Sequence, residues 1–104
     1  MEEFKVIIEE SAEKDLASIL SYISESLKEP AIAKRIFLSI REQVLSLKHM
    51  PFRFAVVDEG PYAAMGVRKI PVENYTAFYL IDEEEKAVHV FRILYNRREW
   101  KNLI

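Results

Sequence analysis

The sequence predicts an α+β fold in the order β-α-α-β-β-β, with two antiparallel helices packed on a curved, mainly antiparallel sheet. Three observations support this prediction. Apolar residues recur at helical spacing in two segments before Pro51, their period changes after that proline, and three runs rich in β-branched and aromatic residues follow. The 104 residues suit a single domain, residues 1–104, without a linker or an internal repeat.

The first half is expected to form one strand and two helices. Residues 4–8 are a short strand candidate, and Ser11 then offers an N-cap for the first helix. This helix keeps an apolar face through about Leu27. Pro30 suits the first turn of the second helix, which cannot extend past Pro51. The apolar positions are Leu16, Ile19, Leu20, Ile23 and Leu27 in the first helix, and Ala33, Ile36, Phe37, Ile40, Val44 and Leu47 in the second.

The second half is expected to form an antiparallel meander. Its strands are predicted at residues 66–72, 75–81 and 87–95, joined by a tight turn at Glu73-Asn74 and an acidic turn at residues 82–85. Residues 52–62 resist assignment, apart from a turn at Gly60-Pro61. Pro71 has no N–H to donate, so we expect its strand to lie where that donor is not needed.

Composition and charge exclude several classes of protein. The chain has no cysteine, which excludes disulfides, thiolate metal sites and a cysteine nucleophile. Because no apolar run is long enough to cross a bilayer, we expect a soluble, cytoplasmic protein without a membrane partner. The net charge of −2 hides an asymmetry: residues 1–29 carry three Lys against eight Asp and Glu, whereas residues 91–104 carry four Lys and Arg against one Glu. This basic end is compatible with a polyanionic partner such as a nucleic acid.

An arginine interrupts the apolar run of the last predicted strand. Arg92 lies among Val, Phe, Ile and Leu residues, and desolvating its charge without a partner would cost several kcal/mol. An anionic partner is therefore implied, either inside the protein or in a ligand such as a phosphate, which the guanidinium group binds bidentately. The structural alternative is a contact of Arg92 with Asp82, Asp58 or a backbone carbonyl.

Five short motifs occur in order along nearly the whole chain. They are Ala12-Glu13-Lys14-Asp15-Leu16, Leu47-Lys48-His49-Met50-Pro51, Gly66-Val67-Arg68-Lys69-Ile70, Phe78-Tyr79-Leu80-Ile81-Asp82 and Arg92-Ile93-Leu94-Tyr95-Asn96-Arg97-Arg98-Glu99-Trp100. With the predicted order of elements, these motifs resemble the RelE/ParE superfamily of toxins from bacterial type II toxin–antitoxin modules. Some members of that superfamily cut messenger RNA in the ribosomal A site without a metal, and others are thought to poison DNA gyrase.

The arginines on two predicted strands favour the first activity, a metal-independent, ribosome-dependent mRNA endoribonuclease that blocks translation. The alternatives are a gyrase poison, which binds a protein and is not a nuclease, and an inactive relative. Similar folds serve both activities, so the fold alone does not choose between them. Neither activity requires a cofactor or a metal.

The nuclease prediction assigns roles to residues that match the motifs of the superfamily. Arg68 would hold the scissile phosphate, Arg92 would face the same cleft, and Tyr95 would stack on a base or transfer a proton. The further residues expected to bind RNA or phosphate are Lys69, Arg97, Arg98 and Arg53. These roles require guanidinium groups from separate strands to converge on one concave surface.

The general base remains unassigned because no residue matches the pattern of the superfamily, and His49 is only a candidate. At a helix C-terminus, His49 would more often be a favourable partner of the helix dipole. Tyr75 and Tyr79 are interpreted as core residues or antitoxin contacts.

The same resemblance implies a cognate antitoxin, together with the ribosome and mRNA, or gyrase in the alternative. An amphipathic antitoxin helix would fit across the apolar outer faces of the two helices. The chain has no helix-turn-helix pattern of its own, so direct sequence-specific DNA binding is not expected.

Overall fold

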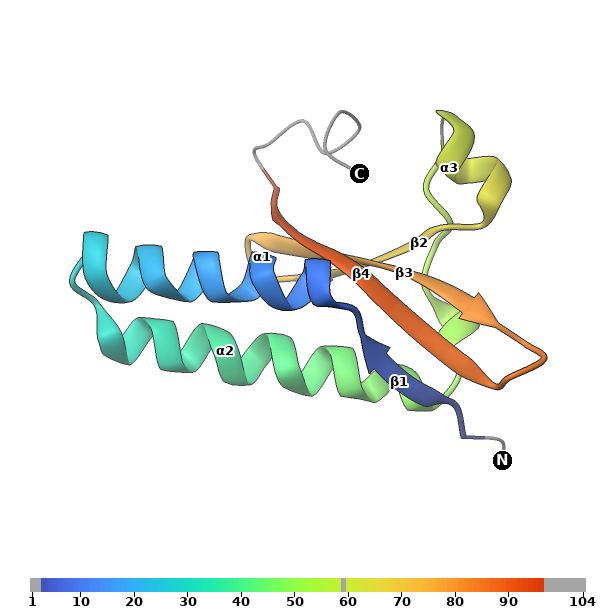
Figure 1. Cartoon of the computed structure of the whole chain (residues 1–104), viewed down its shortest axis with the longest axis horizontal. Coiled ribbons are helices and arrows are strands. Elements are labelled where there is room, and N and C mark those ends of the chain that lie inside the picture. The colour runs from blue at the N-terminus through green and yellow to red at the C-terminus, as the bar shows by residue number, and fades with distance from the viewer. Residues whose placement is uncertain (1–2, 59, 97–104) are drawn as a thin grey trace.

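A computed structural model describes residues 3–58 and 60–96, and in it two long helices lie on one face of a four-stranded sheet (Figure 1). The strands are β1 (Lys5–Ile8), β2 (Arg68–Val72), β3 (Tyr75–Asp82) and β4 (Ala87–Tyr95), and the helices are α1 (Glu10–Ser21), α2 (Pro30–Leu45) and α3 (Gly60–Met65). A π-helical turn, Tyr22–Ser26, follows α1, and two 3₁₀ turns, Ser46–Lys48 and Pro51–Arg53, follow α2. The predicted order is confirmed, with α3 added between the long helices and the meander.

The first strand lies beside the last one in the sheet, whose order is β1-β4-β3-β2. β1 pairs in parallel with β4, whereas β3 pairs antiparallel with both β4 and β2. The mainly antiparallel sheet is therefore confirmed. Pro71 lies on β2, which is an edge strand. At the edge of a sheet, a residue without an N–H does not interrupt the hydrogen bonds between strands.

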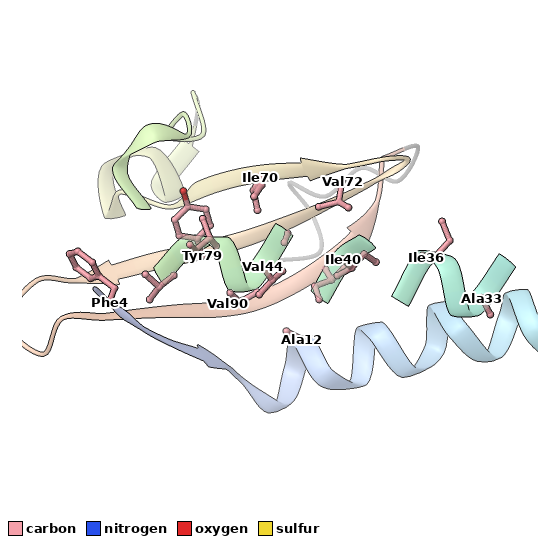
Figure 2. Close-up of a cluster of buried hydrophobic side chains, with 14 of the residues drawn as sticks. Phe4, Ala12, Ala33, Ile36, Ile40, Val44, Ile70, Val72, Tyr79 and Val90 are labelled. Carbon is pink, nitrogen blue, oxygen red and sulfur yellow. The ribbon is translucent and has the colours of Figure 1, made fainter. Parts of the chain in front are cut away.

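The two faces of the sheet carry separate apolar clusters. The larger cluster lies between the sheet and the helices α1 and α2, and its members include Phe4, Ala12, Ala33, Ile36, Ile40, Val44, Ile70, Val72, Tyr79 and Val90 (Figure 2). Strand alternation puts Phe78 and Lys69 on the other face, where Val57, Val67 and Leu94 join Phe78 in a smaller cluster. Tyr62 and Ala63 of α3 pack against this second cluster, so α3 covers part of the face that the long helices leave open (Figure 1).

The start of α1 differs from the prediction. Its N-cap is Glu9 rather than Ser11, and the helix begins at Glu10. The Ser11 hydroxyl instead donates a hydrogen bond of 2.5 Å to the carbonyl of Phe91 on β4. The N-cap prediction was wrong because a tertiary contact uses the side chain that would otherwise cap the helix locally.

The end of the first helical segment is a left-handed cap built on a lysine. After the π-helical turn, the N–H of Glu29 donates to the carbonyl of Ile23 at 3.0 Å, and Lys28 between them has a φ of +55°. This is the bonding pattern of a helix that reverses through a left-handed residue, a position where glycine is preferred. Pro30 then opens α2 in its first turn, as predicted.

None of the helices in the described ranges is long and apolar enough to span a bilayer.

The segment before β2 also differs from the prediction. Gly60, expected in a turn, begins the six residues of α3, and Gly66 lies outside β2, which starts at Arg68. Gly60 and Gly66 have φ values of +75° and +80°, so both ends of α3 use backbone conformations that glycine adopts without strain. Before α3, residues 55–57 run along the outer edge of β2. There the N–H of Lys69 donates to the carbonyl of Ala55 at 3.1 Å.

Candidate functional site

The outer edge of β4 changes partners halfway along the strand. β1 pairs only with residues 87–90, and beyond them the first turns of α1 take its place. The Ser11 hydroxyl donates to the carbonyl of Phe91, and the N–H of Ile93 donates to Asp15 Oδ2 at 2.9 Å. Side chains of a helix thus satisfy backbone groups that a neighbouring strand would otherwise pair.

Arg92 has an anionic partner inside the protein. Its Nε donates to Asp15 Oδ2 at 2.7 Å and its Nη2 donates to Asp15 Oδ1 at 3.0 Å. The two side chains are 25% and 15% exposed, respectively, so the pair is largely withdrawn from water. Because Arg92 donates these hydrogen bonds to the Asp15 carboxylate, the pKa of Arg92 is raised above its usual value. The suggested partners Asp82 and Asp58 were therefore wrong.

A β-bulge decides the face of the sheet to which Arg92 belongs. Arg92 pairs with Phe78 and Val90 pairs with Tyr79, which leaves Phe91 as the extra residue of β4. Strict alternation from Val90 would have placed Arg92 on the face that α1 and α2 cover. The extra residue shifts it to the face of Phe78.

Arg68 lies on the opposite face from Arg92. It pairs with Tyr79, on the face that α1 and α2 cover. Its Nη1 donates to the carbonyls of Phe52 and Phe54 at 3.1 and 2.6 Å, and the guanidinium carbon lies 5.3 Å from the centroid of the Phe52 ring. The strand positions of Arg68 and Arg92 thus do not produce the common concave surface that the sequence led us to expect.

Arg53 lies in the same turn as the carbonyls that Arg68 binds. It donates to the carbonyl of His49 and, at 2.8 Å, to Ser46 Oγ, and its guanidinium carbon lies 4.7 Å from the centroid of the Phe54 ring. Arg53 thereby caps the C-terminal end of the second helical segment. Among residues 3–58 and 60–96, no carboxylate lies within ion-pair distance of Arg53 or Arg68.

Tyr79 on β3 connects this turn to the sheet. Its hydroxyl donates to the carbonyl of Pro51 at 2.7 Å, and the side chain is fully buried. Burial raises the pKa of Tyr79 to about 12, against the opposing effect of the nearby Arg68 and Arg53 charges. Tyr79 is a core residue with a polar tether, in agreement with one of the two interpretations made from the sequence.

Tyr95 lies at a different place, in an apolar groove between the far ends of α1 and α2 and the β2–β3 turn. Its ring centroid is 5.5 Å from that of Tyr75, and both residues line a groove of about 580 Å³. An ion pair between Arg35 and Glu73, with a shortest N–O distance of 2.7 Å, lies at the rim. In this groove Tyr95 is placed for contact with an apolar or aromatic partner.

The remaining candidates do not join a common centre in the described part of the chain. His49 has a buried Nδ1 atom that finds no hydrogen-bond partner in the described ranges. Lys69 belongs to the Phe78 face of the sheet by its register. Arg97 and Arg98 lie outside the described residues. Within those residues, no three His, Asp or Glu side chains are grouped as a metal site would require.

Two side chains on and beside α1 were overlooked as partners of β4. Asp15 binds Arg92, and Glu9 Oε1 lies 2.7 Å from His89 Nδ1. Asp15 belongs to a motif that the sequence analysis had already identified, but no local pattern relates it to a strand 77 residues later. Only the folded arrangement brings these residues together.

Comparisons with known proteins agree with this architecture. Residues 6–100 match the family model described as the ParE toxin of the type II toxin–antitoxin system parDE. Among curated proteins, no sequence matches the chain significantly.

Solved structures of toxin–antitoxin complexes contain chains with the same fold. A chain of the ParDE system from Pseudomonas aeruginosa is 24% identical, with a TM-score of 0.72 and coverage of 88% of this chain and 95% of that one. A chain of RelBE2 from Mycobacterium tuberculosis is 21% identical, with a TM-score of 0.66 and coverage of 91% and 93%. A chain of the RelE–RelB complex from Pyrococcus horikoshii is 20% identical, with a TM-score of 0.55 and coverage of 91% and 97%. The family model covers most of the sequence, and the chain therefore belongs to the ParE toxin family, within the RelE/ParE superfamily of type II toxin–antitoxin toxins.

Proposed function

We propose that this toxin arrests growth by binding a protein target, as a DNA gyrase poison of the ParE type, and that a cognate antitoxin inhibits it. The observation that carries the proposal is the Asp15–Arg92 pair. A nuclease of the predicted kind needs cationic groups that stabilise a charged phosphorus-centred transition state. A carboxylate inside the protein occupies the guanidinium group of Arg92 and neutralises its charge.

The position of Arg68 supports the same proposal. Its Nη1 is hydrogen-bonded to two backbone carbonyls, and it belongs to the sheet face opposite to that of Arg92. A phosphate could not be held between these two residues without a rearrangement of β4. The family model that matches the chain is that of the ParE toxin, the type named in this proposal.

The ribosome-dependent endoribonuclease is the second candidate function. It is favoured by Arg68 and Arg53, whose charges no described carboxylate neutralises, beside the loop that contains His49. In that mechanism Arg68 would bind the scissile phosphate, and Arg53 with Lys69 would bind RNA at the rim. The roles predicted for Arg97 and Arg98 concern residues outside the described ranges.

An antitoxin partner is supported by the nature of the structural neighbours, which come from toxin–antitoxin complexes. The groove that Tyr95 and Tyr75 line is a suitable place for an apolar anchor of a partner protein. Its rim carries Arg35 and Glu73, and polar groups at a rim fix the orientation of a bound segment.

Two assays on the same purified toxin test the proposal. In the first, the toxin is added to DNA gyrase with supercoiled plasmid, and double-strand breaks are measured by gel electrophoresis. In the second, it is added to a translation extract, and message cleavage is mapped by primer extension. DNA breaks without message cleavage are expected. Cleavage at defined codons without an effect on gyrase would contradict the proposal and establish the second candidate.

A further inference from the structure

The turn between α2 and the edge of β2, residues 49–54, exposes two large apolar side chains, and we call it the Phe52 turn. Met50 is 60% exposed and Phe52 is 46% exposed, although Pro51 between them is fully buried. The turn lies beside the start of β1 (Figure 1). Single exposed apolar residues are common on protein surfaces, but two of them in one short turn need an explanation.

Three side chains from separate parts of the fold hold the backbone of the Phe52 turn. Tyr79 on β3, Arg68 on β2 and Arg53 in the turn itself all donate hydrogen bonds to its carbonyl groups, so the turn does not depend on one of them alone. Carbonyls of an exposed turn can bind water, and this arrangement therefore fixes the backbone more firmly than its polar groups require. The bound carbonyls are those of His49, which accepts from Arg53, of Pro51, which accepts from Tyr79 at 2.7 Å, and of Phe52 and Phe54, which accept from Arg68 at 3.1 and 2.6 Å.

Met50 has a backbone conformation that is unfavourable for a residue with a side chain. Its φ is +49° and its ψ is +55°, in the left-handed region where glycine or asparagine is preferred. A residue stays in this region only where the surrounding structure fixes it, and strained residues of this kind concentrate at functional sites. Met50 is also the most exposed large apolar side chain of the described residues, so the strain does not serve the packing of the core.

The surroundings of the Phe52 turn are aromatic and cationic. The rings of Phe52 and Phe4 meet edge to face, with their centroids 6.1 Å apart. Lys48 and Arg53 precede and follow the exposed side chains, and no carboxylate of the described residues lies within ion-pair distance of either. Glu3, the acid of the adjoining backbone bridge, forms no ion pair with them. An apolar surface with cations at its border is complementary to an apolar socket with carboxylates at its border.

We propose that the Phe52 turn is the surface through which the toxin contacts its protein target, with Met50 and Phe52 inserted into an apolar socket that carboxylates border. This inference rests on the proposed function and names the part of the toxin that reaches gyrase. An aromatic side chain that a rigid backbone presents loses little conformational freedom on binding. Such side chains, with polar groups around them, provide most of the binding energy in many protein interfaces.

Other occupants fit the Phe52 turn less well. A second copy of this chain would bring Lys48 and Arg53 against their own copies, and like charges oppose association. RNA would stack on Phe52, but the thioether of Met50 offers no group that a phosphate binds. The guanidinium group of Arg53 also donates to the carbonyl of His49 and to Ser46 Oγ, so part of its hydrogen-bonding capacity is already used inside the protein.

A titration of the toxin against gyrase tests the inference. The measured quantity is the toxin concentration that gives half of the maximal double-strand breaks in supercoiled plasmid. Phe52→Ala and Met50→Asn are each expected to raise this concentration about fivefold or more, because each removes a side chain from the centre of the contact. Asparagine suits the left-handed conformation of residue 50, so the second variant removes the side chain without adding strain.

The chain offers matched controls at positions of similar exposure. Leu38 on α2 is 49% exposed, and Met65 on α3 is 58% exposed. Leu38→Ala and Met65→Asn are expected to change the half-maximal concentration less than about twofold. Circular dichroism and urea denaturation establish that each variant is folded.

The charges at the border of the turn are tested separately. Lys48→Glu is expected to raise the half-maximal concentration about threefold at low salt, with a smaller effect as salt is raised. Lys34→Glu makes the same change of charge at an exposed position on α2, and it is expected to have less than half of that effect. An equal effect of the two variants would contradict the charge complementarity of the Phe52 turn.

Photocrosslinking locates the contact without truncating a side chain. Benzoylphenylalanine in place of Phe52 is expected to link the toxin to a gyrase subunit on irradiation, whereas the same residue in place of Leu38 is not. Equal crosslinking at the two positions would overturn the inference.

The wild type decides the proposed function, and the variants decide the inference. If the wild type poisons gyrase and both Phe52→Ala and Met50→Asn are equally potent, the inference is wrong and the proposed function stands. A wild type without effect on gyrase would refute the proposed function and the inference with it. If the wild type cleaves message and Phe52→Ala does not, the turn binds RNA, and the inference is likewise overturned.

Discussion

Asp15 on α1 and Arg92 on β4 form a two-point ion pair that fastens the first helix to the last strand, with N–O distances of 2.7 and 3.0 Å. The same carboxylate accepts the backbone N–H of Ile93 at 2.9 Å. One acidic side chain thus satisfies a charged group and a backbone donor on the edge of β4 that β1 leaves unpaired beyond Val90. Arg92 was predicted to be catalytic, but in this pair it contributes to the fold. The contribution of the pair to the free energy of unfolding can therefore be measured.

Replacing Asp15 with alanine is expected to lower the free energy of unfolding by about 2 to 4 kcal/mol, because it leaves Arg92 without its carboxylate and the Ile93 N–H without an acceptor. The measurement is urea denaturation followed by circular dichroism. Glu13→Ala is the matched control on the same helix, since Glu13 is exposed, and its effect should stay within about 0.5 kcal/mol. A similar effect of the two substitutions would contradict the structural role of Asp15.

The double-mutant cycle of Asp15→Ala and Arg92→Ala is expected to give a coupling energy of about 1 to 3 kcal/mol, because each substitution removes the partner of the other. The four proteins are compared in the same urea titration. Additive effects would show that Arg92 does not depend on Asp15 in solution, and would restore it as a candidate for phosphate binding.

Tyr79 predicts a loss of stability at alkaline pH. Its folded pKa, about 12, is higher than the ordinary value of 10.0, so the native state keeps the phenolic proton over a range in which the unfolded state releases it. The stabilisation is therefore complete below pH 10 and is lost as the pH rises toward 12, by about 2 to 3 kcal/mol in total. Tyr79→Phe should lack this component, and the difference between the two unfolding curves from pH 8 to pH 12 isolates it. A constant difference over that range would be evidence against the buried, neutral phenol.

Lys28→Gly is expected to stabilise the protein by about 0.5 to 1 kcal/mol, because Lys28 occupies a left-handed conformation with a φ of +55° at the end of the first helical segment. Lys28→Ala is the control for loss of the side chain, and it should not give this gain. Thermal unfolding of the three proteins provides the comparison. A glycine variant that melts below the wild type would mean that the side chain of Lys28 contributes more than the conformational strain removes.

Arg68→Ala distinguishes the two candidate functions in cells. If the toxin acts on a protein target through other surfaces, growth arrest should persist in proportion to the soluble toxin, even though the carbonyls of Phe52 and Phe54 lose a donor. The measurement is growth after induction, normalised to the amount of folded protein. Loss of arrest at an unchanged soluble level would favour the nuclease, in which Arg68 holds the scissile phosphate.

Much of the fold follows from local patterns. The helical spacing of Leu16 through Leu47 predicted two helices, and Pro30 and the Glu73-Asn74 turn predicted where the second helix starts and where β2 and β3 meet. Apolar periodicity reports which side of an element will be buried, and this signal is contained in a few neighbouring residues. This signal could not predict α3, because that six-residue helix has no buried residue.

The candidate site was less predictable, for a reason that Arg92 illustrates. Alternation along β4 places this residue on one face of the sheet, but a single extra residue, Phe91, moves it to the other. Its partner, Asp15, is 77 residues away, and Ser11 binds β4 rather than capping its own helix. Nothing local indicates any of these contacts.

By itself, the sequence determined the order of the elements, their apolar sides and the family to which the chain belongs, because these depend on short-range spacing and on motifs read in order. Only the tertiary structure decided which charges meet. The pairing of β1 with residues 87–90 of β4 and the bulge at Phe91 bring α1 against the edge of β4 that β1 leaves unpaired, and there Asp15 neutralises Arg92. Charge pairing depends on distances in space, and those distances are set only once the strands have paired and the helices have packed on the sheet.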